Sequence, residues 1–131
     1  MPETDDGWTG DELRLIGEAD ELEISSTRPD GTDRPFVTIW AVCVGDGLYI
    51  RSAYGPDNPW FRRAARSGTG RIQSGGVHRA VAFRRVEPAD TATQEALDAA
   101  YRAKYHRYPP QYVSPVVGAA SYQATLRVEP R

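Results

Sequence analysis

Residues 36–53, FVTIWAVCVGDGLYIRSA, decide the fold of this chain. The first nine are apolar at both alternating sets of positions, which is typical of a strand that is covered on both faces. Gly45, Asp46 and Gly47 supply the residues of a tight turn, and residues 48–53 then form the partner strand. The segment therefore predicts an antiparallel hairpin at the centre of the domain.

Three helices are expected around this hairpin. Thr9 and Glu12 have the spacing of a capping box, which predicts a short amphipathic helix after Thr9. Asn58 followed by Pro59 begins a second helix that runs to about residue 66. Apolar residues recur at helical spacing between residues 97 and 108 and predict the third helix.

Six short strands are expected, at residues 23–27, 36–44, 48–53, 71–74, 77–86 and 122–128. Hairpin turns connect several of them, so antiparallel pairing is favoured. This pattern predicts a mainly β, α+β fold, a small antiparallel barrel with helices packed on its outside.

Length and composition limit the class of protein. The chain has 131 residues, the size of one domain, and we expect a disordered tail at residues 1–8 and a single domain at residues 9–131. The longest mostly apolar run has nine residues, against roughly 20 for a membrane span, and no basic-then-apolar leader opens the chain. A single cysteine cannot form an internal disulfide. We therefore expect a cytoplasmic protein, with no membrane segment and no disulfide scaffold.

The net charge of −2 conceals an uneven distribution. Residues 1–33 carry eleven acidic residues and two arginines, whereas residues 34–131 carry fourteen basic and seven acidic residues. The split predicts a basic concavity for an anionic ligand, with the acidic first third on the outside or shielding it. The alternative is that the excess of basic residues after residue 33 only reflects a general abundance of arginine, since the chain has fifteen arginines and one lysine.

Catalytic residues cannot be assigned from the sequence. His78 and His106 lie in different predicted elements and lack an i, i+4 partner, so we expect no metal site. Cys43 lies within an apolar strand, where a thiol is inert. Ser52 and Ser121 lack a nucleophile elbow, and the chain has no phosphate loop.

Residues 48–63 instead have the pattern of an anion-binding site. Arg51 and Ser52 end a strand, and a Gly/Pro loop leads to a helix start at Asn58, with Trp60 and Arg63 in its first turns. Helix-start N–H groups, an arginine fork and a hydroxyl suit a phosphate, and an indole suits a flat ring. The pattern predicts a phosphate-bearing planar cofactor. The alternative is that Trp60 is a core residue and the arginines are surface residues.

These motifs resemble the flavin-binding split β-barrel superfamily, which includes pyridoxamine-phosphate oxidases and deazaflavin-dependent nitroreductases. The resemblance rests on the basic, glycine-containing turn at residues 28–35, on Arg51-Ser52-Ala53 and on Asn58-Pro59-Trp60-Phe61. Residues 23–130 are also similar to DUF2255, a family of unassigned function. The chain departs from the superfamily pattern at Ala53, where a lysine is usual, and at Phe61, where a tyrosine is usual.

The resemblance implies a six-stranded split β-barrel that binds FMN or the deazaflavin F420 for redox chemistry. It implies that Arg28, Arg34 and Arg51 anchor phosphate or carboxylate groups. Ser52 would donate to phosphate, Trp60 would flank the ring beside Asn58, and either Arg51 or Arg63 would supply the charge of the missing lysine. A homodimer with the site at its interface is also implied.

Two other functions stay open. A non-enzymatic module could bind a polyanion such as single-stranded nucleic acid along residues 51–85, with bases stacked on Tyr54, Trp60 and Phe61. The acidic first third disfavours nucleic acid, because it would repel the same ligand. The chain could also be a degenerate barrel that serves assembly. Arg51 and Ser52 are adjacent on a strand, so both reach one pocket only if the strand ends or bulges near Ala53.

Overall fold

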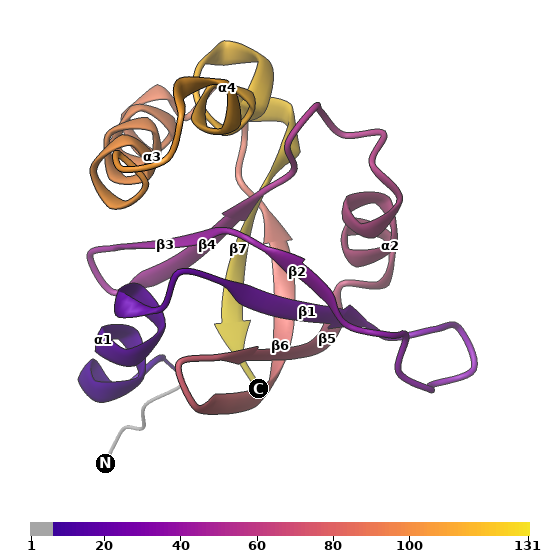
Figure 1. Ribbon diagram of the computed structural model, residues 1–131. Coiled ribbons are helices and arrows are strands. Elements are labelled where there is room, and N and C mark those ends of the chain that lie inside the picture. Colours follow the sequence, from indigo (N-terminus) through magenta and orange to yellow (C-terminus); the bar gives the residue numbers. More distant parts are fainter. Residues whose placement is uncertain (1–6) are drawn as a thin grey trace.

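The computed structural model describes residues 7–131, so most of the tail expected at residues 1–8 lies outside the described residues. Figure 1 shows a curved sheet with helices around its rim. The helices and strands are α1 (Gly10–Glu18), β1 (Leu22–Ser26), β2 (Val37–Ile39), β3 (Ala41–Val44), β4 (Gly47–Arg51), α2 (Pro59–Ser67), β5 (Thr69–Ser74), β6 (Val77–Arg85), α3 (Thr91–Lys104), α4 (Pro110–Val113), the 3-10 helices η1 (Ser114–Val116) and η2 (Ala119–Ala124), and β7 (Thr125–Pro130).

All the described strands belong to one antiparallel sheet in the order β2-β1-β5-β6-β7-β4-β3. The strands at its two ends, β2 and β3, are consecutive in the chain and separated only by Trp40. The sheet therefore curls round until it is nearly closed, which confirms the predicted barrel. It has seven strands rather than six, because the predicted strand 36–44 changes partner at Trp40: Ile39 pairs with Leu22, and Ala41 pairs with Ile50.

The helix starts follow local sequence signals. Thr9 Oγ1 accepts from the Glu12 N–H at 3.1 Å, and Glu12 Oε1 accepts from the Thr9 N–H at 2.9 Å, so the capping box is confirmed. Asn58 is the N-cap of α2, as predicted, but its side chain makes no capping hydrogen bond. The last strand begins at Thr125, later than predicted, because residues 119–124 form η2.

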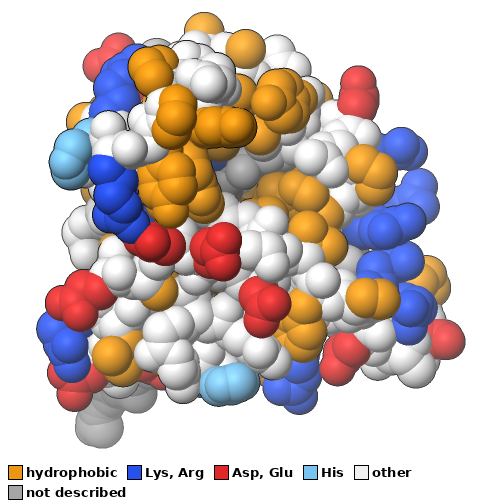
Figure 2. All heavy atoms as spheres, viewed as in Figure 1, with side chains coloured by type: hydrophobic (Ala, Val, Ile, Leu, Met, Phe, Trp, Pro, Cys, Tyr) orange, Lys and Arg blue, Asp and Glu red, His pale blue; other side chains and the backbone are white. Residues whose placement is uncertain are grey.

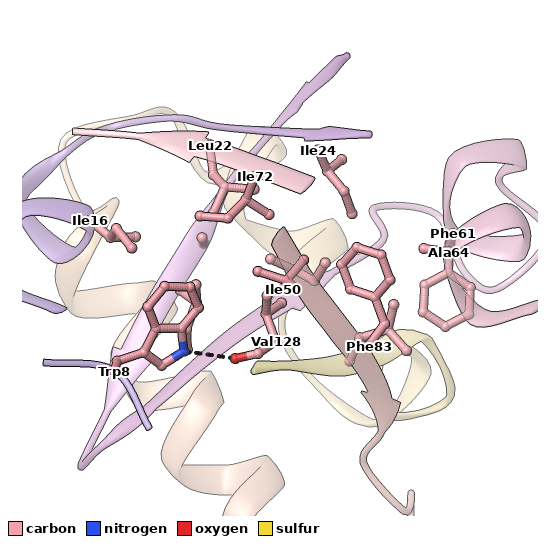
Figure 3. Close-up of a cluster of buried hydrophobic side chains, with 14 of the residues drawn as sticks. Trp8, Ile16, Leu22, Ile24, Ile50, Phe61, Ala64, Ile72, Phe83 and Val128 are labelled. Atoms are coloured by element: carbon pink, nitrogen blue, oxygen red, sulfur yellow. Dashed lines mark hydrogen bonds between the residues drawn. The ribbon is translucent and has the colours of Figure 1, made fainter. Parts of the chain in front are cut away.

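The barrel interior is a continuous apolar core. Strand residues such as Ile24, Ile50 and Ile72 meet inside it, and Phe61 of α2 covers one end (Figure 3). Trp8 is also part of this core: it is 8 % exposed, and its Nε1–H donates to the Val128 carbonyl at 2.9 Å. The domain thus includes Trp8, which the sequence analysis assigned to the tail.

A second apolar cluster lies between the β3–β4 hairpin and α3. Val42 and Tyr49 of the hairpin pack there against Leu97, Tyr101 and Tyr105. Ala41, the neighbour of Val42, belongs to the barrel core instead. The two-sided burial explains why residues 36–44 are apolar at successive positions.

Arg51 joins the barrel to α3. The residue is 2 % exposed, and its Nη1 lies 2.6 Å from Asp98 Oδ1. Its remaining N–H groups donate to the Thr125 hydroxyl, the Val116 carbonyl and two oxygens of Gln94 at 2.7–3.2 Å. All five N–H donors of this guanidinium are therefore used inside the protein.

Asp98 is the matching acceptor. Besides Arg51, it accepts from the Gly118 N–H at 3.0 Å and from the Tyr122 hydroxyl at 2.8 Å. Burial raises the pKa of this carboxyl, but the hydrogen bonds from Gly118, Arg51 and Tyr122 outweigh that effect and leave the pKa below its ordinary value of 3.8. The network fixes the turn between η1 and η2 against α3.

Replacing Arg51 should destabilise the fold. Removal of one partner of a buried ion pair costs about 3–5 kcal/mol, because the other charge stays buried without compensation. We expect Arg51→Ala to lower the free energy of unfolding in urea by that amount. Arg102→Ala, at an exposed position of α3, is the control and should stay within about 0.5 kcal/mol of wild type. Equal stability of the two variants would contradict a structural role for Arg51.

Asp98 should make stability pH-dependent in the acid range. Its pKa is lower in the folded chain than in the unfolded chain, so its contribution is complete above the ordinary value of 3.8. That contribution is lost as the pH falls from there through the folded pKa. In Asp98→Asn the free energy of unfolding should therefore fall less steeply below pH 3.8 than in wild type. Parallel pH profiles of the two proteins would show that Asp98 does not titrate in this way.

Candidate functional site

Two grooves lie beside the start of α2. The first, here called the aromatic groove, has a volume of about 620 Å³ and is lined by β2, the segment from Arg51 to Trp60 and residues 108–116. It contains five aromatic side chains: Trp40, Tyr54, Trp60, Tyr108 and Tyr112. Figure 2 shows hydrophobic side chains on both sides of the hollow between α4 and β2. Its size is that of pockets that bury a small organic ligand.

A ring stack fixes the aromatic wall. Trp40 lies parallel to Tyr105, with ring centroids 3.9 Å apart and planes within 5°, and Tyr108 packs on Trp40 at 4.9 Å. The Tyr105 oxygen lies 2.8 Å from the Asp20 carbonyl and 3.2 Å from the Ala41 N–H. Burial raises the pKa of Tyr105, so its hydroxyl stays neutral. The Trp40 ring therefore has a defined plane against which a flat ligand can stack.

The rim of the aromatic groove carries a strained residue. Tyr54 has a φ of +68° and is the single non-glycine residue of 7–131 with positive φ, and its side chain is 82 % exposed. A bulky residue in the left-handed region is strained, and such strain is concentrated at functional sites. The geometry brings the Tyr54 ring to the groove entrance without burying it.

The second hollow, here called the basic groove, lies on the other side of α2 and has a volume of about 1030 Å³. Six arginines from three regions of the chain line it: Arg28, Arg34, Arg62, Arg63, Arg66 and Arg85. No acidic side chain of the described residues lines it. Figure 2 shows basic side chains gathered on the α2 side of the molecule. The groove is therefore a region of positive potential that favours an anion.

The turn at residues 28–35 presents two of these arginines. Arg28 Nη1 donates to the Asp33 carbonyl at 2.8 Å, and Gly31, at φ +88°, forms the tip of the turn. The Arg34 N–H donates to the Ser26 carbonyl at 3.2 Å, which joins the end of the turn to β1. These bonds hold the arginines over the groove.

Six of the seven predicted site residues line the two grooves. Arg28, Arg34 and Arg63 line the basic groove, and Arg51, Asn58 and Trp60 line the aromatic groove. The six come from two separate segments of the sequence.

Two of the seven, Arg51 and Ser52, do not fit their predicted roles. Arg51 lies at the base of the aromatic groove, but all five of its N–H donors have internal partners, so none is left for a phosphate. Ser52 is fully buried, and its hydroxyl donates to the Gly55 carbonyl at 2.7 Å within its own turn. Both residues support the site from beneath.

Trp40, Tyr108 and Tyr112 also line the aromatic groove but were not among the site residues predicted from the sequence. Tyr108 and Tyr112 flank the predicted helix stop at Pro109 and Pro110, and Trp40 lies within a predicted strand. No signal in the neighbouring sequence indicates that α4 and η1 lie beside the opening of the barrel. The buried contact between Arg51 and the Val116 carbonyl, at 2.8 Å, brings them there.

Residues 7–131 give little support to a metal site or to a reactive cysteine. No group of three or more His, Cys, Asp or Glu side chains in this part of the chain could hold a metal ion. Burial raises the pKa of the Cys43 thiol, which disfavours a reactive thiolate. No helix in the same range is long and apolar enough to cross a membrane.

Solved structures with the same fold include three informative examples. A conserved hypothetical protein from Mycobacterium tuberculosis has a TM-score of 0.55 at 12% identity, over 98% of this chain and 84% of that one. An F420 reductase has a TM-score of 0.53 at 13% identity, over 99% and 94% of the two chains. An FAD and heme binding protein from Mycobacterium smegmatis has a TM-score of 0.52 at 19% identity, over 95% and 67%.

These similarities confirm the split-barrel resemblance at the level of the fold. No curated protein matches the sequence. Residues 12–128, however, match a family described as uncharacterized proteins conserved in bacteria. The match extends over nearly all of the described domain, from α1 to β7. The chain therefore belongs to the DUF2255 family.

Proposed function

We propose that this protein binds a flavin-type cofactor, FMN or F420, and acts as an oxidoreductase. The observation that carries the proposal is the junction of the two grooves at α2. Trp60 lines the aromatic groove, and its neighbours Phe61, Arg62 and Arg63 line the basic groove. A ligand with a planar ring and a phosphate matches this pair of surfaces. The fold shared with an F420 reductase and an FAD and heme binding protein supports the same class of ligand.

The proposed roles follow from position and charge. Trp60 would flank the ring, and Asn58, whose amide does not cap α2, would bond to a polar edge of the ring. Arg28, Arg34 and Arg63 would hold the phosphate through charge-assisted hydrogen bonds. When bound, the cofactor would supply hydride transfer, which accounts for a site without an assignable acid–base pair. The protein would orient the ring and exclude water from it.

A homodimer is a further part of this proposal. Phe36, Val37, Tyr54 and Tyr112 are large apolar residues that stay at least 39 % exposed, and three of them line the aromatic groove. A second copy on this rim would cover them and would close the groove from solvent.

A polyanion-binding module is the second candidate, because the basic groove alone has six arginines and no acidic lining among the described residues. Helix α1, with its acidic first turn, lies on the side of the barrel away from α2 (Figure 1) and so does not shield this groove. In that alternative Tyr54 and Trp60 of the aromatic groove would stack bases beside the arginines. Its signature would be an affinity that falls steeply with salt concentration.

Cofactor binding is the direct test. Titration of the purified protein with FMN and with F420 should give saturable quenching of tryptophan fluorescence for one of them, because Trp60 and Trp40 line the groove. The affinity should fall only modestly with salt, because the cofactor brings few charged groups to the arginines whereas a polyanion brings many phosphates. If neither FMN nor F420 binds at high micromolar concentration, the proposal is refuted. If the protein instead binds single-stranded DNA tightly and in a salt-sensitive way, the polyanion module is favoured.

Substitution of Tyr54 should weaken cofactor binding without lowering the free energy of unfolding. Glycine adopts positive φ freely, so Tyr54→Gly should keep the free energy of unfolding or raise it by about 1 kcal/mol. The same change removes a ring from the groove entrance and should weaken binding of the cofactor roughly 2- to 10-fold. Tyr54→Phe keeps the ring and is the matched control. Unchanged affinity in Tyr54→Gly would exclude Tyr54 from the site.

A further inference from the structure

The aromatic groove has a wall that the proposed cofactor does not use. Asn58 and Trp60, which would hold the cofactor ring, come from the start of α2. The side of the groove away from α2 is formed by Trp40 and by the segment that follows α3, and we call it the tyrosine wall: Trp40, Tyr108, Tyr112, Pro115 and Val116. Helices α2 and α4 lie on opposite sides of the barrel opening (Figure 1), so a ligand on this wall would lie next to a ring held at Trp60.

The tyrosine wall offers ring surface in a fixed arrangement. Trp40 is held by its parallel stack with Tyr105 and by Tyr108, so its plane does not depend on a ligand. Tyr112 is different, because it is 57 % exposed and its side chain makes no hydrogen bond or ring contact with the described residues. An exposed aromatic side chain on a concave, apolar surface is typical of a binding site for an organic ligand.

The charges around the groove indicate an uncharged ligand. Arg51 is the single charged residue among the described residues that line the groove, and its guanidinium is paired with Asp98 and has no free N–H donor. An anion would find its partners in the basic groove, where six arginines lie. A cation would meet no carboxylate here, and exposed ring faces attract a cation only weakly.

The size of the groove allows a second ring. Its volume of about 620 Å³ is about four times the roughly 150 Å³ of a cavity that holds one benzene ring. A flat cofactor of three fused rings would therefore leave space for about one further ring. Thr38 and Tyr112 have the hydroxyl groups that could bond to a polar substituent on that ring.

We propose that the tyrosine wall binds a second planar ligand, an uncharged single-ring aromatic molecule, beside the position of the cofactor ring. Its ring would stack on Trp40 and Tyr112, because aromatic pairs in offset-stacked or edge-to-face geometry gain energy beyond the area they bury. That this molecule is the substrate of the oxidoreductase rests on the proposed function. The binding of an uncharged ring to this wall does not.

The test uses three one-ring compounds of nearly equal shape: benzamide is neutral, benzoate is an anion and benzamidine is a cation. Their binding to wild type, Tyr112→Ala and Leu15→Ala is measured by saturation-transfer NMR without cofactor. Leu15 is an exposed apolar residue of α1 that lines neither groove, so it is the matched control. Benzamide should bind saturably to wild type and to the control, and roughly 3- to 10-fold more weakly to Tyr112→Ala. Benzamidine should bind wild type at least about tenfold more weakly than benzamide, and any binding of benzoate should be unchanged in Tyr112→Ala.

Each other outcome decides against a part of the proposal. No binding of benzamide, equal binding by Tyr112→Ala and wild type, or a preference for benzamidine refutes the site. If FMN or F420 binds and displaces benzamide, the groove holds one ring and the second site is refuted. If neither cofactor binds and benzamide binding still depends on Tyr112, the proposed function fails and the aromatic site stands. Should Tyr112→Ala melt far below wild type, Tyr112→Gln, which keeps a long side chain, takes its place, and equal benzamide affinity of that variant and wild type refutes the site.

Discussion

The ion pair between Arg51 and Asp98 is the interaction on which the functional surface depends. It lies between the end of β4 and α3, and through the Val116 carbonyl and the Gly118 N–H it also holds the segment that follows α4. Helix α4 and that segment contribute Tyr112, Pro115 and Val116 to the aromatic groove. A buried pair is rarely the most stabilising solution for a core. Its effect here is geometric, since a guanidinium with five satisfied donors allows one arrangement of the elements around it.

The two grooves result from the way the barrel closes. At Trp40 the chain leaves β1 and pairs with β4, so the barrel wall opens between β2 and the segment after Arg51. Tyr108 and Tyr112 line one side of this opening, and α2 occupies the other. Helix α2 presents indole to one groove and guanidinium groups to the other. One short helix therefore joins an aromatic surface to a positively charged surface.

Local sequence signals were sufficient for most of the architecture. The capping box at Thr9, the hairpin turn at Gly45 and the helix start at Pro59 act through neighbouring residues, and all are found where the sequence predicts them. The role of Arg51 was not predictable in the same way. Its position one residue before a serine at a strand end favoured the prediction of a phosphate contact, but its partners Asp98 and Thr125 lie 47 and 74 residues away. Only the tertiary structure decides whether such an arginine contacts a ligand or a carboxylate. The positions of Tyr108 and Tyr112 in the aromatic groove likewise depend on contacts between residues that are far apart in the sequence.

The shortness of β2 has a consequence for association between molecules. An opened barrel has free strand edges, and a free edge offers unpaired N–H and C=O groups to strands of other molecules. Here the strand at the opening has three residues, Val37–Ile39, and the chain leaves the edge again at Trp40. Such an edge gives an incoming strand too few backbone hydrogen bonds to hold it, so sheet growth between molecules along β2 is disfavoured. The barrel can therefore stay open at β2 without becoming prone to aggregation along that edge.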